Sequence, residues 1–213
     1  MKRDLSQRTF LDKQSRMAFN PKDHYYKKAK KENFAARSVF KLEEIDRKFH
    51  LLKAGQNILD LGASPGSWSQ YASKKVGSTG RILGVDLSPM TVELSNATFI
   101  QADLRDLKLA EIFEQHGFDP IFDLVLSDMA PKTTGIRFTD QARSMELCEL
   151  ALDVARQFLK PRGHFVCKLF HSDDFNKLRD EIKKSFDRFE AMKPDSTRKI
   201  SKEIFLIGLG KKG

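Results

Sequence analysis

The chain has 213 residues, of which 40% are hydrophobic, so composition excludes wholesale disorder and favours one domain with a real core. Its mean hydropathy is −0.48, and no run approaches the roughly 20 apolar residues that a membrane span needs. The polar start lacks the apolar segment of a signal peptide, so we expect a cytoplasmic protein. Two cysteines and five scattered histidines predict neither a disulfide framework nor a metal site.

The net charge of +9 is unevenly distributed along the chain. Residues 1–53 carry +8, residues 54–192 carry −3 and residues 193–213 carry +4. Basic ends around a slightly acidic middle favour a cationic face for a polyanion, with ordinary solubilising charge as the alternative. We expect a basic N-terminal arm over 1–32 and a single domain over 33–213.

Helices and strands alternate from residue 37 onward. Apolar spacing predicts helices over 37–49, 67–75, 104–115, 139–159 and 173–184, the last starting on aspartate caps. Short apolar runs predict strands over 57–61, 81–86, 98–101, 121–127, 163–169, 188–192 and 203–209. This order predicts an α/β, Rossmann-like, mostly parallel seven-stranded sheet whose last two strands form an antiparallel hairpin.

The predicted strand ends carry small and acidic residues, where open α/β sheets bind ligands. The first strand runs into Gly62-Ala63-Ser64-Pro65-Gly66, whose small side chains let a ligand approach the backbone. A dinucleotide fingerprint needs glycine at Ser64 and Ser67, so the loop favours a single nucleoside over NAD. Asp86 ends the second strand, where a carboxylate accepts from ribose hydroxyls, although such an aspartate can also be a helix cap.

Two further aspartates follow strands. Asp103 comes after the third strand and could accept from an adenine amine, or cap the next helix. Asp128 leaves the apolar fourth strand for a proline-bearing loop, a place that favours a site, where it could hold a cationic ligand group or orient a base.

Lys168 lies inside the apolar fifth strand, where an unpartnered lysine is rare. Desolvation or a second cation would favour its neutral amine, while a snorkelling lysine at a strand end is the alternative. Glu203 enters the last apolar strand and Lys41 borders the buried face of its helix; alone, each would be ordinary. Cys167, beside Lys168, points to the other face of its strand and favours a core role over a nucleophile.

These residues lie in segments that together resemble the FtsJ-type 2′-O-ribose RNA methyltransferases over nearly all of residues 22–212. The segments are DHYYKKAK, ARSVFKLEEID, LDLGASPGSWSQ, GVDL, QAD, SDMAP, FVCKLF and KPDSTRKISKEIFLIG. The resemblance implies an S-adenosylmethionine-dependent methyltransferase fold and a catalytic tetrad of Lys41, Asp128, Lys168 and Glu203. It also implies a cofactor site of Gly66, Trp68, Asp86, Asp103 and Asp128.

The implied activity is methylation of a ribose 2′-hydroxyl, with a uridine of 23S ribosomal RNA in the large subunit as the expected substrate and neither DNA nor a membrane as a partner. Ser67 departs from the usual second glycine and is shared with related tRNA anticodon-loop methyltransferases, which stay an alternative. A non-catalytic RNA-binding protein of this fold is another, which the complete tetrad disfavours.

We expect Lys168 to be the general base. Lys41 is expected to suppress its protonation and to hold the hydroxyl or a phosphate, Asp128 to orient Lys168 and complement the sulfonium, and Glu203 to keep the lysine pair in place. The basic arm, with Lys27, Lys28, Lys30, Lys31 and Arg37, is expected to meet RNA phosphates. Tyr25, Tyr26 and Phe34 are expected either to stack on a base or to pack the arm onto the body.

Overall fold

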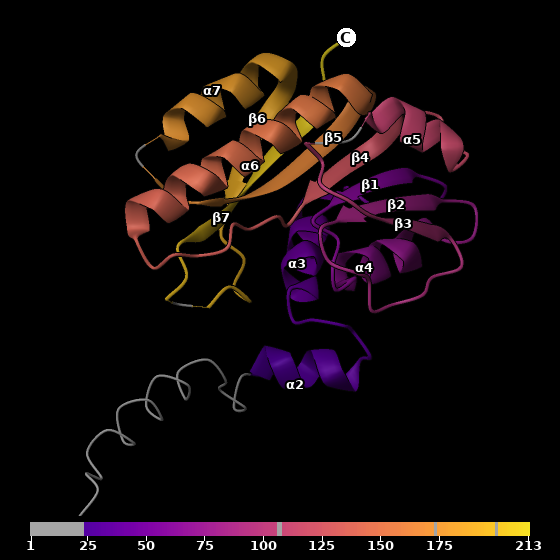
Figure 1. Ribbon diagram of the computed structural model, residues 1–213, viewed down its shortest axis with the longest axis horizontal. Coiled ribbons are helices and arrows are strands. Elements are labelled where there is room, and N and C mark those ends of the chain that lie inside the picture. The colour runs from indigo at the N-terminus through magenta and orange to yellow at the C-terminus, as the bar shows by residue number, and fades with distance from the viewer. Residues whose placement is uncertain (1–23, 106–107, 173, 199) are drawn as a thin grey trace, which may run out of the picture.

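The computed structural model describes residues 24–105, 108–172, 174–198 and 200–213 (Figure 1). Residues 1–23, most of the predicted arm, lie outside the described residues. The rest of the arm is helix α2 (His24–Lys31), followed by α3 (Val39–Phe49). The side chain of Ala29 on α2 is buried in the same apolar cluster as Phe40 of α3, so this part of the arm is packed onto the body.

Seven strands form one sheet in the order β3-β2-β1-β4-β5-β7-β6. Their bounds are β1 (Asn57–Leu61), β2 (Arg81–Asp86), β3 (Ala97–Gln101), β4 (Phe122–Ser127), β5 (Leu159–Phe170), β6 (Phe186–Met192) and β7 (Glu203–Lys211). The first five strands pair in parallel, while β7 inserts antiparallel between β5 and β6. The α/β class, the parallel sheet and the antiparallel final pair are therefore confirmed.

The helices that follow are α4 (Ser67–Val76), α5 (Leu109–Gln115), α6 (Arg137–Phe158) and α7 (Phe175–Ser185). Helix α5 starts five residues later than the predicted 104. Strand β5 starts earlier than the predicted 163, because Leu159 already pairs with Phe122 across an irregular register. The predicted aspartate cap of α7 is wrong in detail, since the side chain of N-cap Asp174 makes no capping hydrogen bond.

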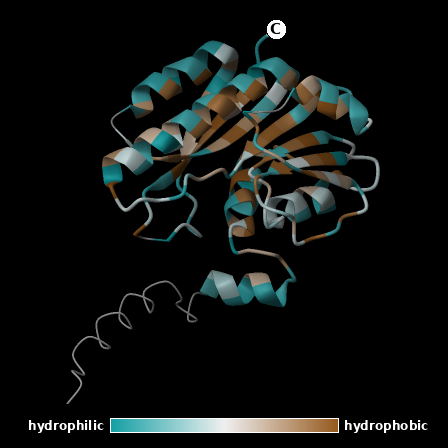
Figure 2. Ribbon diagram, in the orientation of Figure 1, coloured by the Kyte–Doolittle hydropathy of each residue, from teal (hydrophilic) through white to brown (hydrophobic). Residues whose placement is uncertain are grey.

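The two faces of the sheet carry separate apolar clusters, and brown strands lie between mixed helices in Figure 2. Helices α3 and α4 cover the face that includes Leu126, Val166 and Phe205. Helices α5, α6 and α7 cover the other face, which includes Cys167. Because side chains alternate along a strand, Lys168 lies on the α3 and α4 face.

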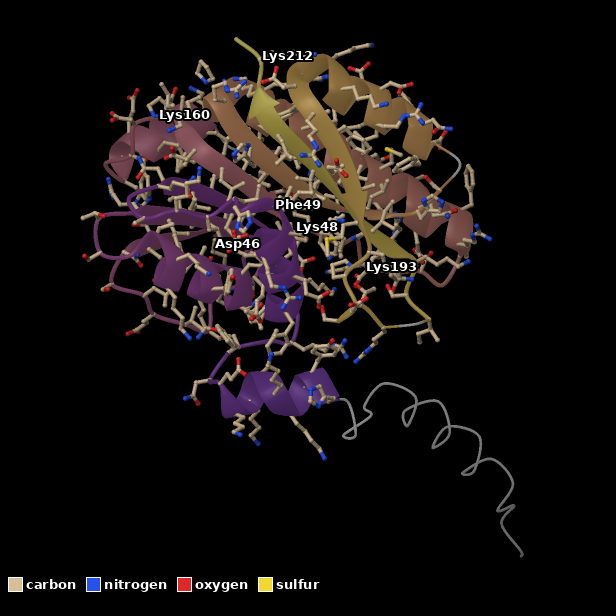
Figure 3. All side chains as sticks on the ribbon, turned by 180° about the vertical axis from the view of Figure 1, so that it is seen from behind. Asp46, Lys48, Phe49, Lys160, Lys193 and Lys212 are labelled. Atoms are coloured by element: carbon tan, nitrogen blue, oxygen red, sulfur yellow. The ribbon has the colours of Figure 1, made fainter. Side chains whose placement is uncertain are left out.

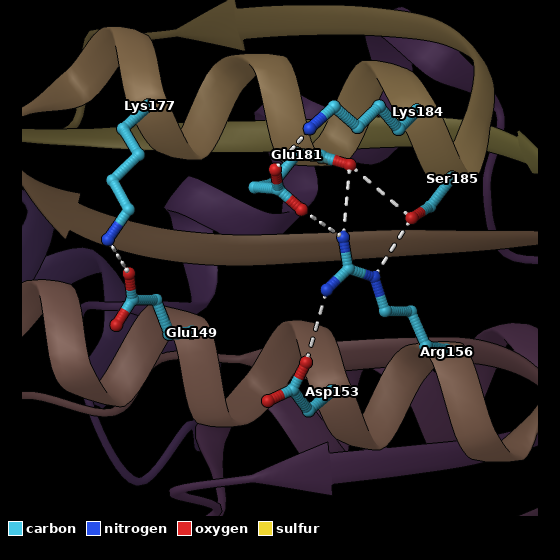
Figure 4. A network of polar contacts seen from close by, with 7 residues as sticks. All are labelled: Glu149, Asp153, Arg156, Lys177, Glu181, Lys184 and Ser185. Atoms are coloured by element: carbon cyan, nitrogen blue, oxygen red, sulfur yellow. Dashed lines mark hydrogen bonds and ion pairs between the residues drawn. The ribbon is translucent and has the colours of Figure 1, made fainter.

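Helices α6 and α7 are joined on their outer side by a polar network (Figure 4). The guanidinium of Arg156 pairs with Glu181 at 2.8 Å and with Asp153 at 3.2 Å, and Lys177 pairs with Glu149 at 3.2 Å. Hydrogen bonds from Lys184 and Arg156 lower the pKa of Glu181 to about 2. These charges lie on the opposite side of the sheet from Lys168, so we assign them to helix packing.

The order of the strands fixes where a site can form. The chain runs from β1 to β2 on one side and returns to β4 on the other, which creates a crevice at the carboxyl ends of β1 and β4. Within the described ranges, no helix combines the length and apolar character that crossing a bilayer requires.

Candidate active site

A pocket opens at the carboxyl ends of β1, β2 and β4. Its lining combines the acidic side chains of Asp86 and Asp103 with apolar ones, and comprises Gly62, Val85, Asp86, Leu87, Ala102, Asp103, Leu104, Arg105, Met129, Ala130, Leu147 and Leu150. Carboxylates above apolar walls suit a nucleoside, whose sugar hydroxyls donate hydrogen bonds while its base buries a flat apolar surface.

Asp86 is fixed by backbone donors. Its Oδ2 accepts from the N–H of Ser64 at 3.0 Å, and its Oδ1 accepts from the N–H of Ser88 at 2.7 Å. A carboxylate has about four acceptor positions, so capacity for ligand hydroxyls is left. The structure thus places Asp86 where the strand-end reasoning expected it.

Asp103 has a partner that sequence reasoning missed. Arg105 grips it through Nε at 3.0 Å and Nη2 at 2.5 Å, and the N–H of Arg105 also donates to it. These hydrogen bonds lower the pKa of Asp103 to about 2, which keeps it an acceptor at any physiological pH. A strand-end acid two residues before an arginine was the available signal.

Two glycines shape the loop beside the pocket. Gly62 has φ +76°, and a Cβ there would lie 2.7 Å from Cγ of Met129. Gly66 has φ +114°, and a Cβ there would overlap the Val92 side chain. Both positions therefore require glycine. Gly66 is not among the residues lining the pocket, so its role in the cofactor site stays a prediction.

The side chain of Trp68 lies elsewhere. It is 2% exposed, its ring packs 5.7 Å from that of Phe205, and its Nε1 donates to the carbonyl of Ser38 at 2.9 Å. The indole therefore supports the core behind the lysines and does not line the pocket. A contact between cofactor and backbone at Trp68 stays a prediction.

The lysine in β5 is paired, as an interior lysine must be. Its Nζ lies 2.9 Å from Oδ1 of Asp128 and donates to the carbonyl oxygen of Asp128 at 2.5 Å. The Lys168 side chain is 7% exposed and that of Asp128 is 18% exposed. Because β4 and β5 are neighbours, with Ser127 opposite Cys167, the sheet itself brings the two charges together.

A second pair lies on the same face. Lys41 Nζ from α3 is 2.5 Å from Oε1 of Glu203, and both side chains are 12% exposed. Lys168 is opposite Phe205 in the β5–β7 register, and Lys41 Nζ lies 5.8 Å from the centroid of the Phe205 ring. Both lysines thus lie near Phe205, each paired with its own carboxylate, although helix α3 and strand β7 come from opposite ends of the chain.

The other face of β5 shows the expected contrast. Cys167 is fully buried, and burial raises the pKa of its thiol well above the ordinary value. The prediction that Cys167 belongs to the core is therefore confirmed. Among the residues that the structure describes, no three His, Cys, Asp or Glu side chains are grouped as metal ligands would be.

One buried acid was not predicted to matter. Asp60 in β1 is fully buried and accepts from the hydroxyl of Ser69 on α4 at 2.6 Å. Burial raises its pKa to about 7, with Asp128 and Asp86 adding like-charge repulsion. The signal was an aspartate inside an apolar strand, the same kind of signal that singled out Lys168.

A basic hollow adjoins the lysines. Its lining consists of Arg37, Ser38, Lys41, Arg198, Ile200, Ser201 and Glu203. Arg37 donates to the carbonyl of Ser196, and burial followed by repulsion from Arg198 lowers its pKa. Such a cationic hollow suits a phosphate backbone.

Two of the three aromatic residues near α2 pack onto the body, and stacking of the third on a base stays a prediction. Tyr25 packs 5.5 Å from the ring of Phe40, and Phe34 lies 6.3 Å from it, so both pack the helix onto the body. Tyr26 stays exposed. Figure 3 shows α2 at the end of the molecule opposite Lys212.

Comparison with known proteins extends over the described fold. Residues 34–211 match the family described as FtsJ-like methyltransferase. The ribosomal RNA large subunit methyltransferase E of Bdellovibrio bacteriovorus is 78% identical over 92% of this chain and 100% of its own length. The protein of that name from Desulfatibacillum aliphaticivorans is 50% identical over 90% of this chain and 92% of its own.

Solved structures agree with the topology. A ribosomal RNA methyltransferase from Plasmodium falciparum superposes with a TM-score of 0.72 at 29% identity, over 84% of this chain and 100% of its own. Fibrillarin from Aeropyrum pernix, crystallised with S-adenosylmethionine, gives 0.54 at 18% identity, over 75% of this chain and 68% of its own. The second likeness concerns the fold alone.

Proposed function

Because the chain belongs to the FtsJ-like methyltransferase family, we propose that it transfers a methyl group from S-adenosylmethionine to the 2′-hydroxyl of a ribose in large-subunit ribosomal RNA, with a 23S uridine as the expected target. The observation that carries this proposal is the two largely buried lysine–carboxylate pairs, together with a pocket whose lining combines two carboxylates with apolar side chains.

The pocket fits the cofactor by its chemistry. Asp86 would hold the ribose hydroxyls, Asp103 the adenine amine, and Leu87, Leu104 and Met129 the flat faces of the base. When bound, S-adenosylmethionine supplies a methyl group on a sulfonium cation whose leaving group is a neutral thioether. Asp128 lies next to Met129 of the pocket wall, where its carboxylate complements that positive charge.

The remaining difficulty is the weakly acidic ribose hydroxyl. We assign Lys168 as the base that removes the proton of this hydroxyl, because Asp128 holds its Nζ in a fixed position and the side chain is shielded from water. Lys41, held by Glu203, brings a second cation to the same face, where it can hold the hydroxyl or a phosphate.

RNA would approach over the basic hollow. Arg37 and Arg198 line it beside Lys41, and the exposed lysines of α2 extend the positive surface. Such contacts position the phosphate backbone in a salt-dependent way. We expect the enzyme to work in the cytoplasm, on its ribosomal substrate.

The test is to map 2′-O-methyl groups in ribosomal RNA from a strain that lacks this protein, and again after the purified chain and labelled S-adenosylmethionine are added to large subunits from that strain. The proposal expects one ribose to lose its methyl group and regain it. The substrate assignment would be overturned if ribosomal RNA from the deletion strain lacked no methyl group, or if the methyl group were missing from tRNA instead.

A further inference from the structure

Three large apolar side chains are exposed at the rim of the site. Ile136 and Phe138 lie where the β4–α6 connection enters α6, and they are 63% and 79% exposed. Ile200 lies on the β6–β7 connection and is 89% exposed. The two connections come together at one end of the sheet (Figure 1). Ile200 lines two hollows that also hold cations, and Ile136 and Phe138 flank Arg137, which lines one of them. Exposed apolar side chains at such a place indicate a binding partner.

The basic hollow has a neighbour. A second hollow, which we call the outer hollow, is lined by Arg137, Asp140, Gln141, Phe170 and Lys202. Ile200 and Ser201 line both hollows. Ile200 therefore stands as a ridge between the place where Lys41 and Glu203 lie and the outer hollow.

Hydrogen bonds hold both connections in place near Ile136, Phe138 and Ile200. Asp140 accepts from the N–H groups of Thr134 and Gly135 at 2.7 and 3.2 Å, which folds the first connection back onto α6. Lys193 Nζ donates to the carbonyl of Ser201 at 2.7 Å, which holds the second. The apolar side chains are thus presented on preorganised turns, which lowers the entropic cost of binding.

The walls of the outer hollow are linked to each other. Gln141 on α6 donates to the carbonyl of His171 at 2.5 Å, and the N–H of His171 donates to the carbonyl of Lys202 at 3.0 Å. Because Ile200 and Ser201 line both hollows, the outer hollow adjoins the basic hollow along one path.

The charges along this path indicate the kind of partner. Arg137 and Lys202 line the outer hollow, while Asp140, the one acid among the described residues that line it, is engaged by Thr134 and Gly135. An apolar ridge flanked by cations matches an unstacked nucleotide, which offers a flat base and a phosphate. It matches an apolar protein segment poorly, because such a segment would leave the cations without partners.

We propose that the outer hollow binds the nucleotide next to the methylated one. Ile200 is the wedge between the two bases, Phe138 and Ile136 contact the neighbouring base, and Arg137 and Lys202 bind its phosphate. The proposal rests on the function given above and deepens it, because the ribose must leave a stack to reach the nearly buried Lys168.

The experiment uses the double variant Phe138→Ala/Ile200→Ala and protein-free large-subunit ribosomal RNA as the probe. Base contacts of this kind predict that half-saturation needs about tenfold more RNA. The dependence of affinity on salt stays that of the wild type, because no phosphate contact is removed. Affinity for S-adenosylmethionine is unchanged, and the conservative Phe138→Tyr/Ile200→Leu variant retains RNA binding.

Ile121→Ala is the control, since Ile121 is also exposed but precedes the amino end of β4, whereas the proposed site adjoins the carboxyl ends of the parallel strands. If the double variant binds protein-free RNA as the control does, the proposal is overturned. A defect seen only with intact subunits would also overturn it, since the rim would then bind a ribosomal protein. If the wild type methylates no ribosomal RNA, the proposed function has failed instead.

Discussion

The carboxyl edge of the sheet has two halves that are built differently. In the pocket half, each acid has a partner two residues away in sequence: Asp86 accepts from Ser88, and Asp103 from Arg105, while Ser64 adds a more distant donor to Asp86. In the lysine half, partners are distant, because Lys41 meets Glu203 and Lys168 meets Asp128. The pocket half presents partly exposed acceptors that act separately. The charged side chains of the lysine half are largely buried, so removing one charge leaves its partner buried without a counter-charge.

The largest expected effect is in the lysine half. Lys168→Ala should lower single-turnover methyl transfer by about 10²–10⁴-fold. Lys41→Ala and Glu203→Ala should also slow it, and each combined with Lys168→Ala should add little further loss, as members of one unit do. Single-turnover rates with labelled cofactor on ribosomal subunits measure this. Losses that multiply would show that the pairs act separately.

The pocket half should fail in a different way. Asp86→Ala should weaken cofactor binding by about 1–3 kcal/mol, because the ligand hydroxyls lose a charged acceptor. The rate at saturating cofactor should stay close to that of the wild type, since the lysine pairs are untouched. Calorimetry gives the affinity, and unchanged affinity would remove Asp86 from the site.

A smaller effect is expected on RNA binding from α2. Lys27, Lys30 and Lys31 are exposed, whereas Lys28 lies 4.3 Å from the centroid of the Phe40 ring. Replacing the three exposed lysines with glutamine should reduce the slope of log affinity against log salt by up to about three. Cofactor affinity should not change.

The control for that variant replaces Lys183, Lys184 and Lys212 with glutamine. Lys183 and Lys184 lie in the last turn of α7, and the backbone N–H of Lys212 donates to the carbonyl of Ser185 at the end of that helix. This part of the molecule lies at the end opposite α2. An equal loss of slope in both triple variants would mean that α2 contributes only general charge.

A further prediction concerns Asp60, which is buried in β1 and for which we expect an effect on stability with little effect on catalysis. Its raised pKa means that the folded protein binds more protons than the unfolded chain between about pH 4 and pH 7. Its contribution to stability therefore falls as the pH rises through that range. Asp60→Asn should gain stability relative to the wild type on going from pH 4 to pH 8, by no more than about 4 kcal/mol.

Urea unfolding of both proteins at several pH values measures this difference. A constant difference between Asp60→Asn and the wild type would show that Asp60 does not titrate in the folded protein within this range. Asn can still accept from Ser69, so the packing of α4 is retained.

The same contrast explains what the sequence could predict. Strands 57–61 and 81–86 are predicted to the residue because apolar runs end at a glycine loop and at Asp86. The Lys168–Asp128 pairing depends on the position of β4 beside β5, and the position of Glu203 relative to Lys168 depends on β7 beside β5. Local pattern determines neither arrangement; there the family resemblance supplied the grouping. The burial of Trp68 and the grip of Arg105 on Asp103 depend on packing and rotamers. The burial of Asp60 and the exposure of Ile136, Phe138 and Ile200 could not be predicted from the sequence, because both depend on how the chain packs.

The central claim is that Lys168 takes the proton of the acceptor hydroxyl, and Lys168→Arg tests it most directly. A guanidinium keeps the positive charge and can pair with Asp128, but it cannot act as a base near neutral pH. The account predicts a folded protein that binds S-adenosylmethionine and RNA and shows a single-turnover rate as low as that of Lys168→Ala. A rate near that of the wild type would contradict the account and leave Lys168 with positioning alone.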